Sequence, residues 1–250
     1  FQVLQFLEVD AAAAGLHLAE FLGMLESDHP YYGEDPENPI LRGYVPEPQP
    51  GYLTDAFARE AASFIHRHAA EPFFLYFAPN AVHSQYQATK AELANVPASV
   101  KGDQRRVFAA VLMGLDRAIG AIDATLRAEK LDQDTIIAIV SDNGGVRAGR
   151  TTPLRGRKGS NYEGGIRVPF VLSWPRRLAA SSIYRAPVSS LDLTPTFLAA
   201  AGAPASPVGE KPGRRGRRGT AGSAELAARL RFSRLHRRRT RGERRRAPPA

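Results

Sequence analysis

Four side chains in this 250-residue sequence could act together on an anionic group. Asp142 and Asn143 directly follow the apolar run TIIAIV, and their carboxylate and amide oxygens are hard ligands suited to Ca²⁺ or Mg²⁺. Lys158 lies among glycines in RGRKGSNYEGG, where the backbone can approach a ligand closely and the lysine can donate to sulfate or phosphate. His83 follows the apolar segment FFLYFA, and a histidine, which exchanges protons near neutral pH, could protonate a leaving oxygen.

Each of these residues also has a purely structural interpretation. Asp142 and Asn143 could form a strand exit with an Asn-Gly turn, and Lys158 could be a solvated cation on a loop. A single surface histidine usually has no chemical role. We give that interpretation to the other five histidines of the chain: His17, His29, His66, His68 and His236.

Three apolar segments are predicted to be buried strands that position these residues. They are FFLYFA (73–78), TIIAIVS (135–141) and VPFVLSW (168–174). Helical segments alternate with them, which predicts an α/β fold with a central, mostly parallel, buried sheet and helices on both faces. Ligands collect outside the carboxyl ends of strands in such sheets, so the loops that follow residues 78 and 140 are the expected places for a site.

The helices are predicted from apolar periodicity. TDAFAREAASFIHRH is expected to begin with Thr54 as its cap, and the segment from Asp103 to Lys130 with Asp103 as its cap. SLDLTPTFLAAAG is expected to form a short helix ended by Gly202. Seven apolar residues step by three or four along the second helix: Phe108, Val111, Leu112, Leu115, Ile119, Ile122 and Leu126.

The net charge of +9 belongs to the C-terminal segment. From Gly209 onward there are 15 Lys and Arg against three Glu, whereas residues 1–208 carry a net charge of −3. Residues 209–250 are expected to be a disordered Arg-rich tail. The body is therefore not a nucleic-acid surface, and only the tail could bind nucleic acid or an anionic membrane.

The sequence contains no cysteine, which excludes disulfides, thiolate metal sites and cysteine nucleophiles. No apolar run reaches the roughly 18 residues of a membrane helix. The chain begins at Phe1 without an initiator methionine, so we expect that its true N-terminus lies upstream.

Several motifs together resemble the sulfatase family of the alkaline-phosphatase-like superfamily. They are HPYY, PGYLTDAFAREAASFI, PFFLYFAPNAVHS, SDNGG and KGSNYEGGIRVPF, and the resemblance runs from about Gly15 to about Val208. It implies that residues 15–208 are the C-terminal portion of a sulfatase catalytic domain, with residues 1–14 as an edge of unclear structure. The fold it implies is the α/β fold above, in incomplete form.

The resemblance also implies roles for the four side chains. Asp142 and Asn143 match the family's late pair of calcium ligands, and Lys158 matches the lysine that contacts the sulfate and the bridging oxygen. His83 matches the histidine that assists departure of that oxygen, although Val82 stands where the family often has proline. A divalent cation, a lysine and a proton donor would stabilise the negative charge that develops during sulfate ester hydrolysis.

Four more charged residues of the same loop are expected to support these. Glu163 and Arg167 are expected to pair with each other or to hold the loop, and Arg155 and Arg157 could be additional cations behind the site. The substrate implied is a sulfate-ester small molecule or a sulfated glycan.

The nucleophile of the family is absent from this chain. It is a formylglycine made from Cys or Ser in a C/S-x-P-S-R motif, and the sequence contains neither a cysteine nor that motif. The early aspartate pair of the calcium site and the GKWH-like segment are absent too. We therefore expect the 250 residues alone to have no sulfatase activity and to bind calcium weakly, because two ligands fall far short of the about six to eight oxygens that calcium takes.

Two other functions remain open from the sequence. A phosphonate or phosphate ester hydrolase of the same superfamily could use these loops, and a non-catalytic binding protein could use the basic tail on acidic partners. The tail composition is also that expected of GC-rich DNA translated out of frame. Export to the periplasm or outside the cell is an expectation from the family only.

Overall fold

The structure is a computed structural model that divides into two compact units, Phe1–Arg176 and Arg177–Ala250. The residues that it describes are 17–18, 22–23, 30–33 and 35–202. The predicted edge 1–14 and the predicted tail 209–250 lie outside the described residues. None of the helices in the described part is long and apolar enough to cross a lipid bilayer.

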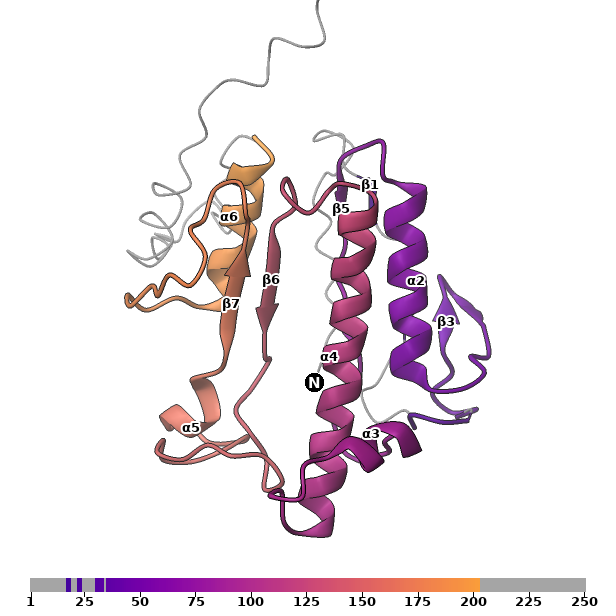
Figure 1. Ribbon diagram of the computed structural model, residues 1–250, viewed down its shortest axis with the longest axis vertical. Helices are drawn as coiled ribbons and strands as arrows, with labels where there is room; N and C mark the ends of the chain where they lie inside the picture. Colours follow the sequence, from indigo (N-terminus) through magenta and orange to yellow (C-terminus); the bar gives the residue numbers. More distant parts are fainter. Residues whose placement is uncertain (1–16, 19–21, 24–29, 34, 203–250) are drawn as a thin grey trace, which may run out of the picture. The chain divides into compact units, whose positions relative to one another are not determined.

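Two long helices, α2 (Leu53–Arg67) and α4 (Asp103–Ala128), pack side by side in the first unit (Figure 1). The short helix α3 (Lys90–Asn95) also packs on α4. Asp55 in the first turn of α2 and Arg67 in its last turn match the charge preference of a helix dipole. These helices carry most of the buried apolar side chains that lie in the first unit.

The helix starts differ from the predictions by one or two residues. The cap of α2 is Tyr52, and Thr54 is fully buried within the first turn. The cap of α4 is Gly102, whose φ of 86° is accessible to glycine at little cost, so Asp103 is the first helical residue. Both predicted caps are therefore wrong. The start of each helix depends on the backbone conformation, which the sequence pattern does not specify.

The buried face of α4 is built from small side chains. Its buried residues are Ala110, Val111, Gly114, Ala118 and Leu126. Of the seven apolar residues predicted to form the buried stripe, only Val111 and Leu126 are buried, and Leu112 is 48% exposed. A Cβ on Gly114 would lie 3.4 Å from the Tyr52 ring, so the small residues allow close approach at this face.

Arg117 on α4 links the three helices by ion pairs. It lies 2.7 Å from the Asp55 carboxylate on α2 and 2.7 Å from the Glu92 carboxylate on α3. Glu92 is buried, so removal of the arginine would leave a buried carboxylate without its cation.

We expect Arg117→Met to lower the free energy of unfolding by about 2 kcal/mol, less than for a fully buried pair because Arg117 is half exposed. The matched control is Arg127→Met, which breaks only the exposed pair of Arg127 with Asp123 and should cost at most about 0.5 kcal/mol. Urea denaturation of the two variants measures both values. Equal losses would show that burial of Glu92 does not matter.

Among the residues that the structure describes, the strands of the first unit form three small sheets. β1 (His17–Leu18) pairs with β5 (Phe73–Phe74) in parallel, and β6 (Ile137–Val140) pairs with β7 (Phe170–Ser173) antiparallel. The third sheet is antiparallel and has the order β2, β3, β4, with bounds Leu22–Gly23, Leu41–Arg42 and Val45–Pro46. A single central, mostly parallel sheet is therefore not what the described residues form.

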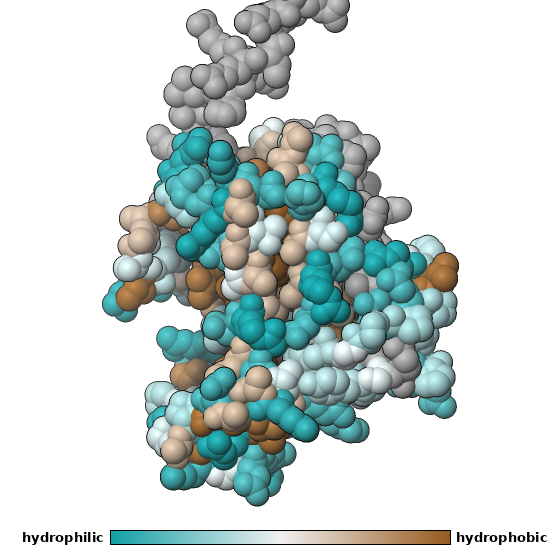
Figure 2. All heavy atoms as spheres, turned by 45° about the vertical axis from the view of Figure 1, so that its right-hand side comes forward, coloured by the Kyte–Doolittle hydropathy of each residue, from teal (hydrophilic) through white to brown (hydrophobic). Residues whose placement is uncertain are grey.

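The predicted strands are also shorter and less buried than expected. FFLYFA forms a strand only at its first two residues, and Tyr76 is 66% exposed. Ile139 on β6 and Val171 on β7 are exposed, and Figure 2 shows hydrophobic residues reaching the surface in groups between hydrophilic ones. An apolar sequence makes a strand suitable for burial, but burial requires neighbouring strands and helices over both faces.

The second unit contains one described helical segment. The 3₁₀ turn η1 (Ser190–Asp192) leads into α6 (Leu193–Ala200), and Ser189 and Asp192 form a capping box at its start. Gly202 has a φ of 73°, and its backbone N–H donates to the carbonyl of Ala199. The predicted short helix ended by Gly202 is confirmed.

Candidate active site

The segment that carries His83 is fixed by a buried tyrosine. The hydroxyl of Tyr31 donates to the backbone carbonyls of Asn80, at 3.2 Å, and of His83, at 2.9 Å. Tyr31 and Tyr52 pack with Val111 of α4, and Val82 packs against this group. Tyr86 packs there too, so the loop that follows β5 is attached to the α4 core on both sides of the histidine.

Tyr31 was not predicted as a functional residue. Burial is the largest of the causes that raise its pKa far above the ordinary tyrosine value, so the hydroxyl remains a donor at any physiological pH. Its backbone N–H and that of Tyr32 donate to Oε1 of Gln87, at 2.9 and 3.2 Å. The motif HPYY, noted only as part of the family resemblance, was the signal that could have identified it.

The structure brings His83 and Lys158 together, although 75 positions separate them in the sequence. Nζ of Lys158 lies 3.2 Å from Nε2 of His83, and Nδ1 of His83 lies 2.7 Å from the carbonyl oxygen of Ser84. A carbonyl only accepts, so Nδ1 is the ring nitrogen that donates to Ser84, and Nε2 is the one that faces the lysine. The two side chains expected to act on an anion therefore lie together.

Lys158 is positioned by a loop that folds back on itself. Its backbone N–H donates to the carbonyl of Gly145 at 3.1 Å, and the N–H of Gly144 donates to the carbonyl of Gly165 at 2.8 Å. The N–H of Gly164 donates to the carbonyl of Arg155 at 2.7 Å. The start and the end of the glycine-rich loop are thus joined on either side of the lysine.

Only glycine fits at several points of this loop. A Cβ on Gly144 would lie 2.0 Å from the carbonyl oxygen of Gly164, and one on Gly165 would lie 2.0 Å from that of Ser160. Real Cβ atoms do not approach backbone so closely, so these backbones can meet only without side chains. The glycines therefore decide where Lys158 lies.

Asp142 and Asn143 follow β6 as predicted. The amide nitrogen of Asn143 donates to Oδ2 of Asp142, and the hydroxyl of Ser141 donates to the backbone carbonyl of Asn143 at 2.9 Å. Asp142 is exposed, and Gly144 and Gly145 connect the pair to the backbone contact of Lys158. The pair therefore lies on the same loop as Lys158.

Two oxygen-bearing side chains suit a hard cation in kind, but they are too few to complete a site for one. Calcium takes about six to eight oxygen ligands. Across residues 30–33 and 35–202, no three His, Cys, Asp or Glu side chains gather in a group that could hold a metal ion. A calcium site built on Asp142 and Asn143 would need further oxygen ligands.

Two other arginines of the loop, Arg155 and Arg167, have local partners. Arg167 lies 3.2 Å from the Glu163 carboxylate, which confirms the predicted pair, and the Arg155 guanidinium lies 3.8 Å from the centre of the Tyr162 ring.

Two histidines at the end of α2 also have local partners. His66 contacts Glu129 at 2.7 Å, and His68 contacts Glu71 at 2.6 Å. These contacts agree with a structural interpretation of the two histidines.

Comparisons with known proteins give a consistent result. Residues 15–203 match the family described as "Sulfatase". Steryl-sulfatase of Homo sapiens is 32% identical over 204 residues, covering 76% of this chain and 33% of the relative. Arylsulfatase A of Homo sapiens is 34% identical over 177 residues, covering 66% of this chain and 33% of the relative. The chain spans about a third of the length of these relatives.

A solved structure is similar over most of the chain. The crystal structure of Ps i-CgsB in complex with k-i-k-neocarrahexaose matches with a TM-score of 0.70 and 33% identity, covering 74% of this chain and 46% of that one. The likeness supports the predicted α/β fold class, although the described strands form only small sheets.

Proposed function

The chain belongs to the sulfatase family, and we propose that its protein hydrolyses sulfate esters with Lys158 and His83 acting on the transferring group. The contact between Lys158 Nζ and His83 Nε2, at 3.2 Å, is the observation that carries this proposal. It places the amino group of a lysine beside the imidazole ring of a histidine at one point of the surface. A sulfate ester suits both side chains, because its anionic oxygens can bind Lys158 and its leaving ester oxygen can take a proton from His83.

In the proposed reaction the bond between sulfur and the ester oxygen breaks, and water supplies the new oxygen on sulfur. The products are an alcohol and inorganic sulfate. Lys158 would donate to the sulfate oxygens, where negative charge gathers in the transition state. An anion that binds here would replace the direct contact of Lys158 with His83 by one bond to each.

Once an anion has replaced the contact with Lys158, Nε2 of His83 would take a proton from solution, and the ring would then give that proton to the departing ester oxygen. Its Nδ1 already donates to the carbonyl of Ser84, so Nε2, the atom that faces Lys158, is the one that can pass a proton to substrate. The bonds from Tyr31 to the carbonyls of Asn80 and His83 would hold the ring in place during this step.

Asp142 and Asn143 would be the side chains of this chain that hold a calcium ion, which when bound would add positive charge near the sulfate group. The formylglycine nucleophile of the family has no counterpart here, since the 250 residues contain no cysteine and no C/S-x-P-S-R motif. We therefore derive no step through that group. We expect the 250-residue chain made alone not to hydrolyse sulfate esters, and measurable turnover of an aryl sulfate by it would contradict this.

We also infer that β5, β6 and β7 belong to one larger, mostly parallel sheet in the intact protein, meaning the full product of the gene. The exposed apolar side chains of Phe74, Ile139 and Val171 support this inference, because a sheet covered by helices on both faces would bury them.

We expect His83→Gln in the intact protein to affect substrates according to their leaving group. Hydrolysis of an alkyl sulfate should fall about 100-fold, because the alkoxide needs a proton as it leaves. Hydrolysis of p-nitrophenyl sulfate should fall less than about tenfold, because nitrophenolate leaves without one. Steady-state rates for the two esters measure the difference.

His66→Gln is the matched control, since His66 is exposed on α2 and its ring contacts Glu129, outside the candidate site. Equal losses on both esters would remove His83 from the role of proton donor. Wild-type protein that hydrolyses p-nitrophenyl phosphate but no sulfate ester would replace the proposed function with that of a phosphate ester hydrolase. Absence of any turnover, with binding of sulfated ligands retained, would favour a binding protein.

A further inference from the structure

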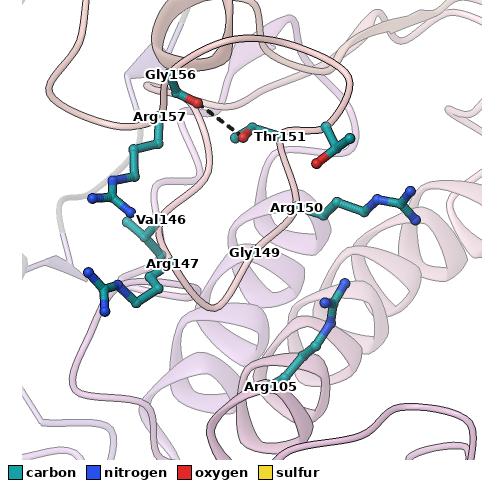
Figure 3. Close-up of a pocket in the computed structure, with 9 residues that line it drawn as sticks. Arg105, Val146, Arg147, Gly149, Arg150, Thr151, Gly156 and Arg157 are labelled. Atoms are coloured by element: carbon teal, nitrogen blue, oxygen red, sulfur yellow. Dashed lines mark hydrogen bonds between the residues drawn. The ribbon is translucent and has the colours of Figure 1, made fainter.

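A pocket of about 630 Å³ lies between the first turn of α4 and the loop that follows β6, all within the first unit (Figure 3). Four arginines line it: Arg105, Arg147, Arg150 and Arg157. No aspartate or glutamate is among its lining residues. The volume lies within the range of about 300–1,000 Å³ that is usual for ligand pockets.

The four arginines differ from several others in the described part of the chain. Arg42, Arg117, Arg127, Arg167 and Arg176 each lie within 3.2 Å of a carboxylate. Across residues 30–33 and 35–202, none of the four pocket arginines forms an ion pair. Like charges gathered without carboxylates repel one another, and an anion from solution would relieve that repulsion.

The pocket wall is a defined piece of backbone. The N–H of Gly149 donates to the carbonyl of Val146 at 3.0 Å, and that of Leu154 to the carbonyl of Thr151 at 2.8 Å. The hydroxyl of Thr151 donates to the carbonyl of Gly156 at 3.0 Å, the bond drawn in Figure 3. Arg147 thus lies in the first of these turns, Arg150 lies between the two turns, and Arg105 extends from α4.

The pocket is continuous with the candidate active site along the chain. Arg157 directly precedes Lys158, and Val146 directly follows Gly145, whose carbonyl accepts from the backbone N–H of Lys158. A ligand whose sulfate group lies at Lys158 would therefore have its remaining parts near these arginines.

The arrangement of the arginines indicates the shape of the ligand. In Figure 3, Arg147 and Arg157 extend to one side of the loop, and Arg105 and Arg150 to the other. Guanidinium groups bind sulfate and carboxylate oxygens in pairs of parallel bonds. Charges spread in this way suit several anionic groups on one molecule better than a single small anion.

We propose that the pocket binds additional sulfate groups of a polysulfated saccharide whose reacting sulfate lies at Lys158 and His83. This inference rests on the proposed function, because it names the substrate class of the same site. The lining contains no aromatic side chain on which a nucleobase could stack, which argues against a nucleic acid as the ligand. Thr151 and Thr152 add hydroxyl groups to the lining, as polar partners for a saccharide.

The test is binding to the intact protein, measured by calorimetry with two probes: a tetrasaccharide that carries several sulfate groups and a disaccharide that carries one. We expect Arg147→Gln combined with Arg150→Gln to weaken binding of the first probe at least about tenfold, because two guanidinium contacts are lost. Binding of the second probe should change less than about twofold, because Lys158 and His83 remain.

The matched control is Arg59→Gln combined with Arg185→Gln. Both residues are exposed and lie outside the pocket, and the two changes lower the net charge by the same amount as the pocket variant does. Equal weakening by the control would show a general charge effect and overturn the proposal. Equal weakening of both probes by the pocket variant would overturn it too, as would inorganic sulfate binding as tightly as the tetrasaccharide.

A variant that fails to fold is recognised by circular dichroism. Arg105→Gln, a change at an exposed position in the first turn of α4, then provides a second test with the same expected direction. The outcome is separable from that of the proposed function. Turnover of an aryl sulfate with no effect of the pocket variants on polysulfated binding would leave the function standing and remove this inference.

Arginine-dependent binding of the tetrasaccharide without turnover of any sulfate ester would have a different meaning. It would remove the proposed function and the placement of a reacting sulfate at Lys158, while the pocket itself would stand as an anion site.

Discussion

Lys158→Ala in the intact protein is expected to lower kcat/KM for p-nitrophenyl sulfate by about 10²–10³-fold, the usual loss when one donor to a developing anion is removed. Lys158 is exposed, and its Nζ contacts Nε2 of His83 at the surface, so the change should leave folding intact. The loss should be in kcat as well as in KM, because negative charge on the sulfate oxygens is greatest in the transition state. Steady-state kinetics measure both constants.

The matched control for this prediction is Lys101→Ala, an exposed lysine that precedes α4. It removes the same charge and should change kcat/KM less than about twofold. Lys158→Arg keeps the charge but not the compact ammonium group, so we expect only part of the activity to return. Full activity of Lys158→Ala would remove the lysine from the site and with it the main support for the proposed function.

Gly144→Ala is expected to have the second large effect, and it acts through the backbone. The added Cβ would lie 2.0 Å from the carbonyl oxygen of Gly164 and 2.8 Å from the Cα of Gly165. The loop must then move apart, which should lower the free energy of unfolding by about 2 kcal/mol or more. Turnover of an aryl sulfate should fall more than about tenfold, because the same loop positions Lys158.

Gly120→Ala is the control, because Gly120 lies in α4 and a Cβ there would meet no atom within 4 Å apart from the backbone of its own helix. Alanine favours a helix over glycine by about 1 kcal/mol, so this variant should be as stable as wild type or more stable. Thermal denaturation and the aryl sulfate assay are run on both variants. A fully stable and active Gly144→Ala protein would show that the close approach of Gly144 to Gly164 is not required.

The candidate residues of the site could be proposed from the sequence. Asp142 and Asn143 at the end of β6, Lys158 among glycines and His83 beyond β5 were identified from residue type and local spacing. The family was predicted from the motifs around them, and the match of residues 15–203 confirms it. Local spacing carries this information because turns, helix periods and ligand types are properties of a few neighbouring residues.

The exposure of the strands could not be predicted in this way. The apolar runs that contain β5, β6 and β7 indicate strands but do not say which strands will pair, and the pairing of β6 with β7 is antiparallel. The prediction of the buried face of α4 was also wrong in part. The small residues Ala110, Gly114 and Ala118 are buried, and Leu112 is exposed. Helical period restricts the choice of face, but the shape of the neighbouring helix selects it.

Long-range contacts in the site were decided by tertiary structure alone. The 3.2 Å contact of His83 with Lys158, the bonds from Tyr31 to the His83 loop and the pocket shared by Arg105 and Arg150 each join residues far apart in sequence. Residue type determines what each of these groups can bind. Which of them meet depends on how closely backbones can approach, and here the meeting of Gly144 with Gly164 and the packing of Tyr31 on α4 bring them together.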